Sequence, residues 1–216
     1  GIEIANRLLD EAGLRRRNGA GIRLRPDGEP LRIYLETSST MSGTTQLFQM
    51  ISADWTDVGV ETKVKTTARQ LFAQRRNALL CDVPVWGGAG EILPTLDPRW
   101  FIPNNAASFH GLDYVRWYRT GGRKGSEPPP AMRRCLELFE RLQATMDEEE
   151  QIRLFRQIIE INRQNLWVIG VVGGTPAMFI VKDSFRNVPE VAVSCWPLRT
   201  PGATAPECYA IDESGA

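Results

Sequence analysis

The order of apolar patterns between residues 31 and 86 constrains the fold of this chain more than any other feature. Apolar residues alternate with polar ones in residues 31–37 and again in residues 60–66, and residues 81–86 form a short apolar run. Each of these segments predicts a strand, and a helical pattern lies between each pair. Strand, helix, strand, helix and strand in this order predict an α/β layer with right-handed crossovers.

The two helical patterns and their ends support this interpretation. In residues 44–59 the apolar residues recur at helical spacing, and Gly59 stands where a left-handed residue ends a helix. In residues 67–78 the apolar side chains, Phe72 among them, share one helical face. Pro84 interrupts the last predicted strand and therefore indicates an edge position or a bulge.

The second half of the chain predicts a different arrangement. Residues 127–145 and 146–165 carry apolar stripes at helical spacing, and Asp147 is placed as an N-cap residue. Because the turn between them is short, we expect an antiparallel helical pair. Residues 166–183 predict two strands around a Gly-Gly pair, and the proline-rich tail after residue 186 predicts irregular structure.

Composition excludes several classes of protein and site. The 26 basic and 26 acidic residues cancel, which argues against a nucleic-acid-binding protein. The longest apolar stretch, residues 166–172, is too short to cross a bilayer. The chain has one histidine, His110, and four cysteines without close paired spacing, so we expect neither a metal site nor a cofactor. Cys195 and Cys208 can bridge in an oxidising compartment, which the sequence leaves open.

Residues 82–101 form the most unusual connecting segment. They follow the third predicted strand and combine glycines, prolines, acids and two tryptophans. In open α/β sheets, ligands bind beyond the carboxyl ends of the strands. This position and composition predict the rim of a binding site, in which Trp86 either stacks on a ligand or fills the core at the strand end.

The order of several segments resembles the family 5 extracellular solute-binding proteins, the peptide, oligopeptide and nickel receptors of ABC importers. The segments that carry the resemblance are ANRLLDEAGL…DGEPLRI, QMISADWTDVGVETKV, ARQLFAQRR, DVPVWGGAG, DEEEQIRLFRQIIEINRQNLWVIGVV and FRNVPE. It covers residues 3–190, and it is the order and spacing of the segments that are specific.

The resemblance implies a periplasmic-binding-protein-like lobe with a central sheet flanked by helices, a C-terminal helical pair and an irregular tail. Residues 1–186 would form the second lobe of a two-lobed protein, and residues 187–216 would return towards the first lobe. Such a receptor is not an enzyme. It captures a peptide-like or other small solute and delivers it to a membrane permease. The resemblance further implies a monomer that is periplasmic, or extracellular and membrane-associated.

The resemblance also implies which residues contact solute. In peptide-binding members a GW.gD motif after this strand places an aspartate against the α-amino group of the ligand. Trp86 and Gly88 match this motif, but Ala89 follows where the aspartate belongs, so Glu91 or Asp97 is the alternative acid. The complete predicted set is Trp86, Gly87, Gly88, Glu91, Asp97 and Trp117, the last on a charged and aromatic stretch that suits a cleft lip.

Other functions remain open at this point. The same fold also serves receptors for oligosaccharides and other small solutes. A hydrolase would need an acid–base pair, for which His110 and Asp113 are the candidates. A structural or interaction module would be built on the helical pair, but mixed charges mark no partner face there.

Overall fold

The computed structural model describes residues 1–88, 94–171, 173, 178–193 and 202–212. The chain divides into two compact units. The first consists of residues 1–87 and 111–126, and the second of residues 88–110 and 127–216.

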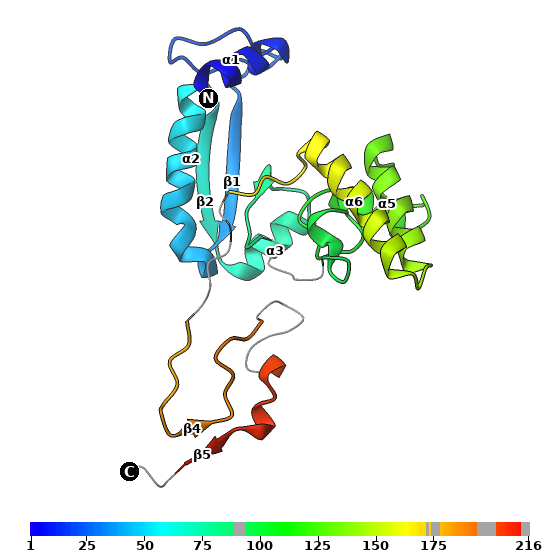
Figure 1. The fold of residues 1–216 in the computed structure, drawn as a ribbon. Coiled ribbons are helices and arrows are strands. Elements are labelled where there is room, and N and C mark those ends of the chain that lie inside the picture. Colours follow the sequence, from blue (N-terminus) through cyan, green and yellow to red (C-terminus); the bar gives the residue numbers. More distant parts are fainter. Residues whose placement is uncertain (89–93, 172, 174–177, 194–201, 213–216) are drawn as a thin grey trace. The chain divides into compact units, whose positions relative to one another are not determined.

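A parallel three-stranded sheet in the order β2-β1-β3 organises the first unit (Figure 1). Two helices alternate with the strands along the chain, as the sequence predicts. The elements are β1 (Arg32–Ser38), α2 (Thr45–Asp57), β2 (Glu61–Thr67), α3 (Arg69–Asn77) and β3 (Val83–Pro84). A 3-10 segment, η1 (Ser39–Thr44), joins β1 to α2. The α/β prediction is therefore confirmed.

The central strand carries the core of this sheet. Leu35 of β1 is 3% exposed and lies between Val64 of β2 and Val83 of β3 in the register of the sheet. Phe48 of α2 and Phe72 of α3 are also buried, because the helices turn these apolar side chains inward. Leu71, which the apolar pattern places on the same face of α3, is 47% exposed, so this part of the expectation is wrong. β3 is a two-residue edge strand, which confirms the edge position indicated by its proline.

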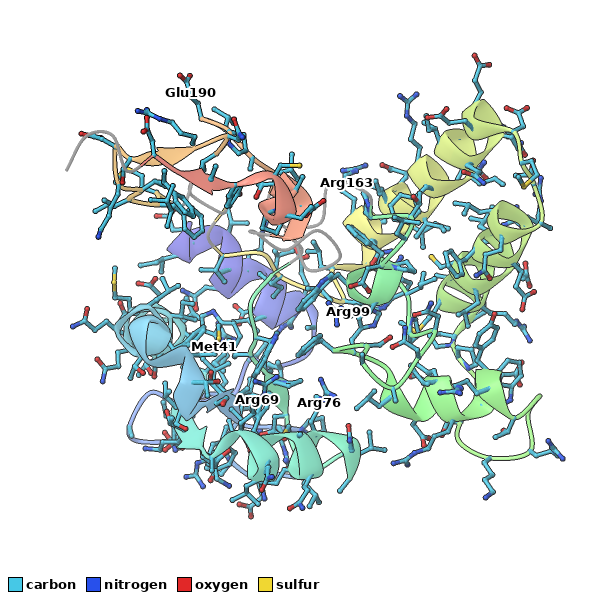
Figure 2. All side chains as sticks on the ribbon, turned by 90° about the horizontal axis from the view of Figure 1, so that it is seen from below. Met41, Arg69, Arg76, Arg99, Arg163 and Glu190 are labelled. Carbon is cyan, nitrogen blue, oxygen red and sulfur yellow. The ribbon has the colours of Figure 1, made fainter. Side chains whose placement is uncertain are left out.

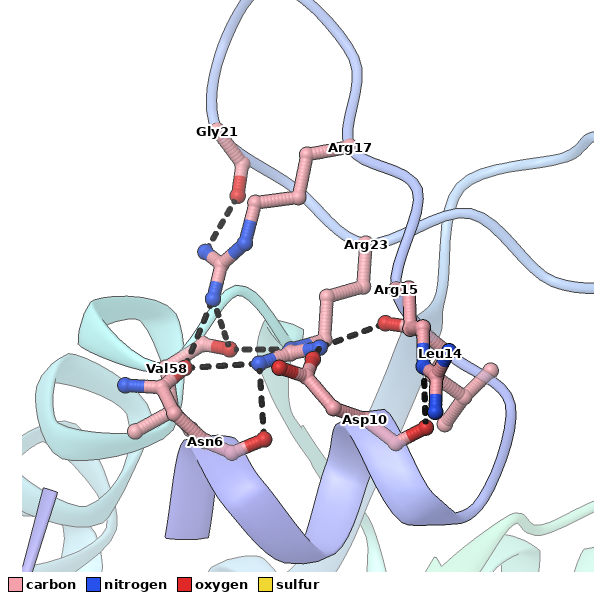
Figure 3. A network of polar contacts seen from close by, with 8 residues as sticks. All are labelled: Asn6, Asp10, Leu14, Arg15, Arg17, Gly21, Arg23 and Val58. Atoms are coloured by element: carbon pink, nitrogen blue, oxygen red, sulfur yellow. Dashed lines mark hydrogen bonds and ion pairs between the residues drawn. The ribbon is translucent and has the colours of Figure 1, made fainter. Parts of the chain in front are cut away.

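A buried arginine fastens the N-terminal segment to the end of α2 (Figure 3). The first helix, α1 (Ile2–Glu11), is followed by a loop from which Arg23 returns, 1% exposed. Arg23 donates to the Asp10 carboxylate at 2.5 Å, to Asn6 Oδ1 at 2.7 Å and to the Val58 carbonyl at 2.8 Å. Val58 lies just beyond α2, where carbonyl groups are free and a cation is favourable.

The second unit is built on the predicted helical pair, α5 (Pro130–Gln143) and α6 (Glu148–Asn165). Asp147 caps α6 as expected, because its side chain accepts hydrogen bonds from the backbone N–H groups of Glu149 and Glu150. The buried residues of the two helices are Met132, Cys135, Leu136, Leu138, Phe139, Leu142, Leu154, Phe155 and Ile158.

Two expectations for this unit are wrong. The apolar spacing of residues 146–165 also places Ile152 and Ile159 in the stripe of α6, but both are 43% exposed, because the buried face is centred on Leu154, Phe155 and Ile158. The described parts of residues 166–183 form no strand, and Ile180 is fully exposed there. A strand needs a neighbour to pair its backbone groups, and the described residues supply none for this segment.

The described part of the tail is irregular, as predicted, apart from two kinds of short element. A two-residue antiparallel pair joins β4 (Phe185–Arg186) to β5 (Ala210–Ile211). Two 3-10 turns, η3 (Gly202–Thr204) and η4 (Pro206–Cys208), precede β5. Cys208 is a free thiol, while Cys195, its expected partner, lies outside the described residues.

Candidate functional site

The carboxyl ends of the three parallel strands lie at one edge of the sheet. The residues that directly follow or end these strands, 38–41, 67–69 and 85–87, are called the carboxyl edge below. Figure 2 views the molecule from below Figure 1, the side to which the arrowheads of β1 and β2 point. Met41 and Arg69 are labelled in that view and belong to this edge.

Trp86 is held in place by α3. Its ring stacks on Phe72, with ring centroids 5.7 Å apart and an interplanar angle of 9°. The guanidinium of Arg69 lies over the Trp86 ring, 5.6 Å from the centroid. Phe72 is 2% exposed, whereas Trp86 is only half-buried. Trp86 therefore both covers the end of the core and keeps part of its surface at the carboxyl edge.

The two glycines after Trp86 are not required by packing. A Cβ atom added at Gly87 would lie 3.8 Å from Met41 Cε, an ordinary contact, and one added at Gly88 would meet nothing within 4 Å. Neither glycine has a positive φ that would demand this residue type. Their absent side chains instead leave the backbone beside Trp86 uncovered.

Hydroxyl groups line the ends of β1 and β2. Ser38 is fully buried, and its hydroxyl pairs with that of Thr40 at 2.9 Å. The hydroxyl oxygens of Thr37 and Thr67 are shielded and form no hydrogen bond within the part of the chain that the structure describes. These two groups can donate or accept hydrogen bonds at the end of the sheet.

A buried ion pair fixes α3 against β1 just before the carboxyl edge. Arg75 donates to both oxygens of Glu36, at 2.8 and 2.7 Å, and also to the Leu80 carbonyl. Glu36 has a side chain that is only 2% exposed, and hydrogen bonding to Arg75 holds its pKa below the ordinary value. A charged, doubly bonded carboxylate of this kind positions a helix with geometric precision.

The two predicted acids have different outcomes. Glu91 lies outside the described residues. Asp97 belongs to the second unit and precedes a short 3-10 turn, η2 (Pro98–Trp100). Its carboxylate lies 2.7 Å from the guanidinium of Arg99, and both side chains are 17% exposed. A counter-charge within its own loop thus compensates Asp97, and its contact with solute stays a prediction.

Trp117 lies in α4 (Leu112–Arg119), within the first unit. Its indole packs beside Gly122, where an added Cβ would be 3.4 Å from Trp117 Nε1. The loop folds back so closely that a Cβ at Gly125 would be 2.2 Å from the Asp113 carbonyl oxygen. The structure therefore gives Trp117 a packing role in this loop, and its predicted solute contact stays untested.

The acid–base candidates each have other partners within their own units. His110 stacks on Trp167 at 6.3 Å, and burial lowers its pKa to about 4, so the ring is neutral at physiological pH. Asp113 accepts a hydrogen bond from Ser126 at 2.5 Å and another from Arg116 at 3.3 Å. Asp113 is thus engaged by its neighbours, whereas both ring nitrogens of His110 are buried without a hydrogen-bond partner among the described residues.

Comparisons by sequence found no match: no family model matches the chain, and no curated protein matches it significantly. Comparison of structures is decisive. The chain aligns over 98% of its length with the oligopeptide-binding protein OppA, with 30% identity and a TM-score of 0.75. The chain belongs to the family 5 extracellular solute-binding proteins. It spans 35% of the length of OppA.

Two more distant structures share the fold. AppA from Bacillus subtilis, solved with a nonapeptide, has 18% identity and a TM-score of 0.55, with 76% of this chain and 29% of AppA covered. MelB from Agrobacterium fabrum, solved with stachyose, has 16% identity and a TM-score of 0.65, with 77% of this chain and 25% of MelB covered. A bilayer-spanning helix is absent from the described residues of this solute-binding protein.

Sequence reasoning missed two residues at the carboxyl edge, Arg69 and Met41. The sequence did carry a signal for Arg69. It is the first residue of a helix, a position where the helix dipole disfavours a cation. Met41 carries no comparable signal, since it lies in η1, which residue patterns did not predict. In this solute-binding protein the segments after β1 and β2 thus contribute to the edge together with the predicted segment after β3.

The cysteines of the protein should differ sharply in reactivity. Burial raises the pKa of Cys81 to about 11 and that of Cys135 to about 12, whereas Cys208 is exposed. Iodoacetamide at pH 8 should therefore label Cys208 at least roughly tenfold faster than Cys81 and Cys135, because the thiolate is the reactive form. Peptide mass mapping measures this, and unfolding in urea should equalise the rates. Equal labelling of Cys135 in the native protein would contradict the described core.

Among the described residues, no group of three or more histidine, cysteine or acidic side chains is placed to hold a metal ion.

Proposed function

We propose that this chain forms one wall of an extracytoplasmic solute-binding receptor of an ABC importer, which captures a small solute between two lobes. The observation that carries the proposal is the position of Trp86. An aromatic ring fixed by Phe72 stands at the carboxyl edge of a parallel sheet, in a chain that aligns with OppA over 98% of its length. Ligands of open α/β sheets bind at this edge.

The proposal assigns parts of the receptor to parts of the chain. Residues 1–186 belong to the second lobe, and residues 187–216 return towards the first. The solute-facing residues are Trp86, Gly87 and Gly88, with Glu91, Asp97 and Trp117 as further predicted contacts. The receptor works as a monomer in the periplasm, or outside the cell at the membrane, and hands its solute to a membrane permease without chemical change.

A peptide-like solute is favoured over an oligosaccharide. The alignment with OppA, described as oligopeptide-binding, has 30% identity, whereas that with the stachyose complex of MelB has 16%. A rigid tryptophan face suits both classes, since it can stack on a sugar ring or on a peptide plane. The oligosaccharide receptor is therefore the second candidate.

A thermal unfolding assay on the full-length protein tests the proposal. The panel contains peptides of two to nine residues and neutral oligosaccharides, stachyose among them. A true solute at 100 times its Kd should stabilise the native protein by about 2.7 kcal/mol. Stabilisation by peptides, with every peptide recovered intact, is the expected result. Stabilisation by sugars alone would favour the second candidate, and hydrolysis of a peptide would contradict the receptor proposal.

A further inference from the structure

Arg69 is the most distinctive charged residue of the carboxyl edge. Its guanidinium lies 5.6 Å from the centroid of the Trp86 ring, and its side chain is exposed. The described residues offer it no ion pair. Several other arginines of the same unit form ion pairs: Arg23 contacts Asp10, Arg32 contacts Glu61, and Arg75 contacts Glu36.

The ring beneath Arg69 restricts the side chain. An arginine over an aromatic face loses little hydration and remains available for further bonding through its edge. Because Trp86 is itself stacked on buried Phe72, the guanidinium rests on a fixed platform. Its five N–H donors match a planar oxyanion such as a carboxylate, in a bidentate arrangement.

Among the described residues, the start of α3 adds positive potential and no negative charge. Arg69 is the first residue of α3, and neither the N-cap residue, Ala68, nor the first turn supplies an acid or a side-chain cap. The free N–H groups of the first turn carry partial positive charge. A cation at this end of a helix is unfavourable unless an anion joins it. Thr67, two residues earlier, contributes a shielded hydroxyl without a hydrogen-bond partner among the described residues.

From these contacts we infer that Arg69 is the specificity-determining residue of the carboxyl edge and that it selects solutes bearing a carboxylate. In this inference Arg69 binds the carboxylate of a solute that lies beside Trp86. This inference rests on the proposed receptor function, which it refines by naming the chemical group that the solute must carry. It also differs from amino-group recognition by an aspartate, for which Ala89 stands at the matching position of this sequence.

Three tetrapeptides separate the possible sources of the carboxylate. The first is Ala-Gln-Ala-Ala with a free C-terminus, the second is Ala-Glu-Ala-Ala amide, and the third is Ala-Gln-Ala-Ala amide, which lacks any carboxylate. Isothermal titration of the full-length protein should show that the first or the second peptide binds about tenfold more tightly than the third. Tighter binding of the first identifies a terminal carboxylate, and tighter binding of the second identifies a side-chain carboxylate.

Variants of Arg69 assign this preference to the residue. Arg69→Gln should abolish the tenfold difference and leave the affinity for the carboxylate-free amide within about twofold of the wild-type value. Arg69→Lys should keep part of the preference, because lysine keeps the positive charge but cannot form the bidentate hydrogen bonds of a guanidinium. The melting temperature of each variant, measured without peptide, checks that the fold is intact.

Each other outcome counts against the inference. Equal affinity of the wild-type protein for all three peptides overturns it. An equal loss of affinity for all three peptides in Arg69→Gln also overturns it, because Arg69 would then only support Trp86. Binding of stachyose with no binding of any peptide overturns the inference but leaves the receptor function standing. If neither the peptides nor stachyose bind, the proposed function fails, and the inference fails with it.

Discussion

Replacing Arg75 by methionine should destabilise the protein by about 3 kcal/mol, because it leaves the carboxylate of Glu36 buried without its partner. Both oxygens of Glu36 accept hydrogen bonds from Arg75 at 2.8 and 2.7 Å, and the side chain is only 2% exposed. Lys65 Nζ, at 3.9 Å, is too distant to replace these two bonds. Urea unfolding of the variant and the wild type measures the difference.

The same ion pair predicts an acid dependence of stability. Hydrogen bonding to Arg75 lowers the pKa of Glu36 in the folded protein below its ordinary value of 4.5. The stabilisation is therefore present above the unfolded pKa and is lost as the pH falls through the folded pKa. The double variant Glu36→Gln, Arg75→Met should consequently lose less stability between pH 5 and pH 3, an interval of about two units around that value, than the wild type.

A matched control separates this pair from an ordinary surface pair. Arg153 also contacts both oxygens of an acid, Glu150, at 2.6 Å, but its side chain is 60% exposed. Arg153→Met should cost no more than about 0.5 kcal/mol. If Arg75→Met were as mild as Arg153→Met, the buried pair would not hold α3 in place.

Replacing Arg23 by methionine should cost a similar amount, about 3 kcal/mol. The substitution keeps the apolar stem but removes donors to the Asp10 carboxylate, the Asn6 amide oxygen and the carbonyls of Leu14 and Val58 (Figure 3). Differential scanning calorimetry should show a fall in melting temperature of roughly 6–12 °C. The network also joins residues distant in sequence, so the N-terminal segment should become sensitive to proteolysis.

Arg25 provides the control for this prediction. It lies two residues further along the same loop and pairs with Asp27, but its side chain is 47% exposed. Arg25→Met should change stability by no more than about 0.5 kcal/mol. A proteolysis pattern that is the same in Arg23→Met as in Arg25→Met would show that the buried network does not anchor the N-terminal segment.

Local patterns were sufficient to predict most of the framework. Strand and helix patterns are short-range signals, and β1, α2, β2, α3, α5 and α6 all form where the apolar spacing indicates. The cap at Asp147 and the edge position of Pro84 follow from equally local chemistry.

The remaining features depend on contacts between distant residues. Arg23 is charged and lies in a segment with a loop pattern, and only its hydrogen bonds to four other residues explain its burial. Residues 166–183 have a strand-like sequence, but the described ones among them form no strand. Strand formation requires a neighbouring strand, which no local pattern can guarantee. Arg69 and Trp86 are brought together only by tertiary packing. The sequence therefore pointed to the tryptophan, which follows a predicted strand, but not to the arginine.

Isothermal titration of the most stabilising solute against Trp86→Ala and Trp86→Phe variants of the full-length protein tests the central claim most directly. If the carboxyl edge is the solute-facing wall, Trp86→Ala should weaken binding by about 30-fold, which corresponds to about 2 kcal/mol. Trp86→Phe keeps an aromatic face and should stay within about threefold of the wild type. Unchanged affinity in a folded Trp86→Ala variant would show that solute binds elsewhere and would contradict the account.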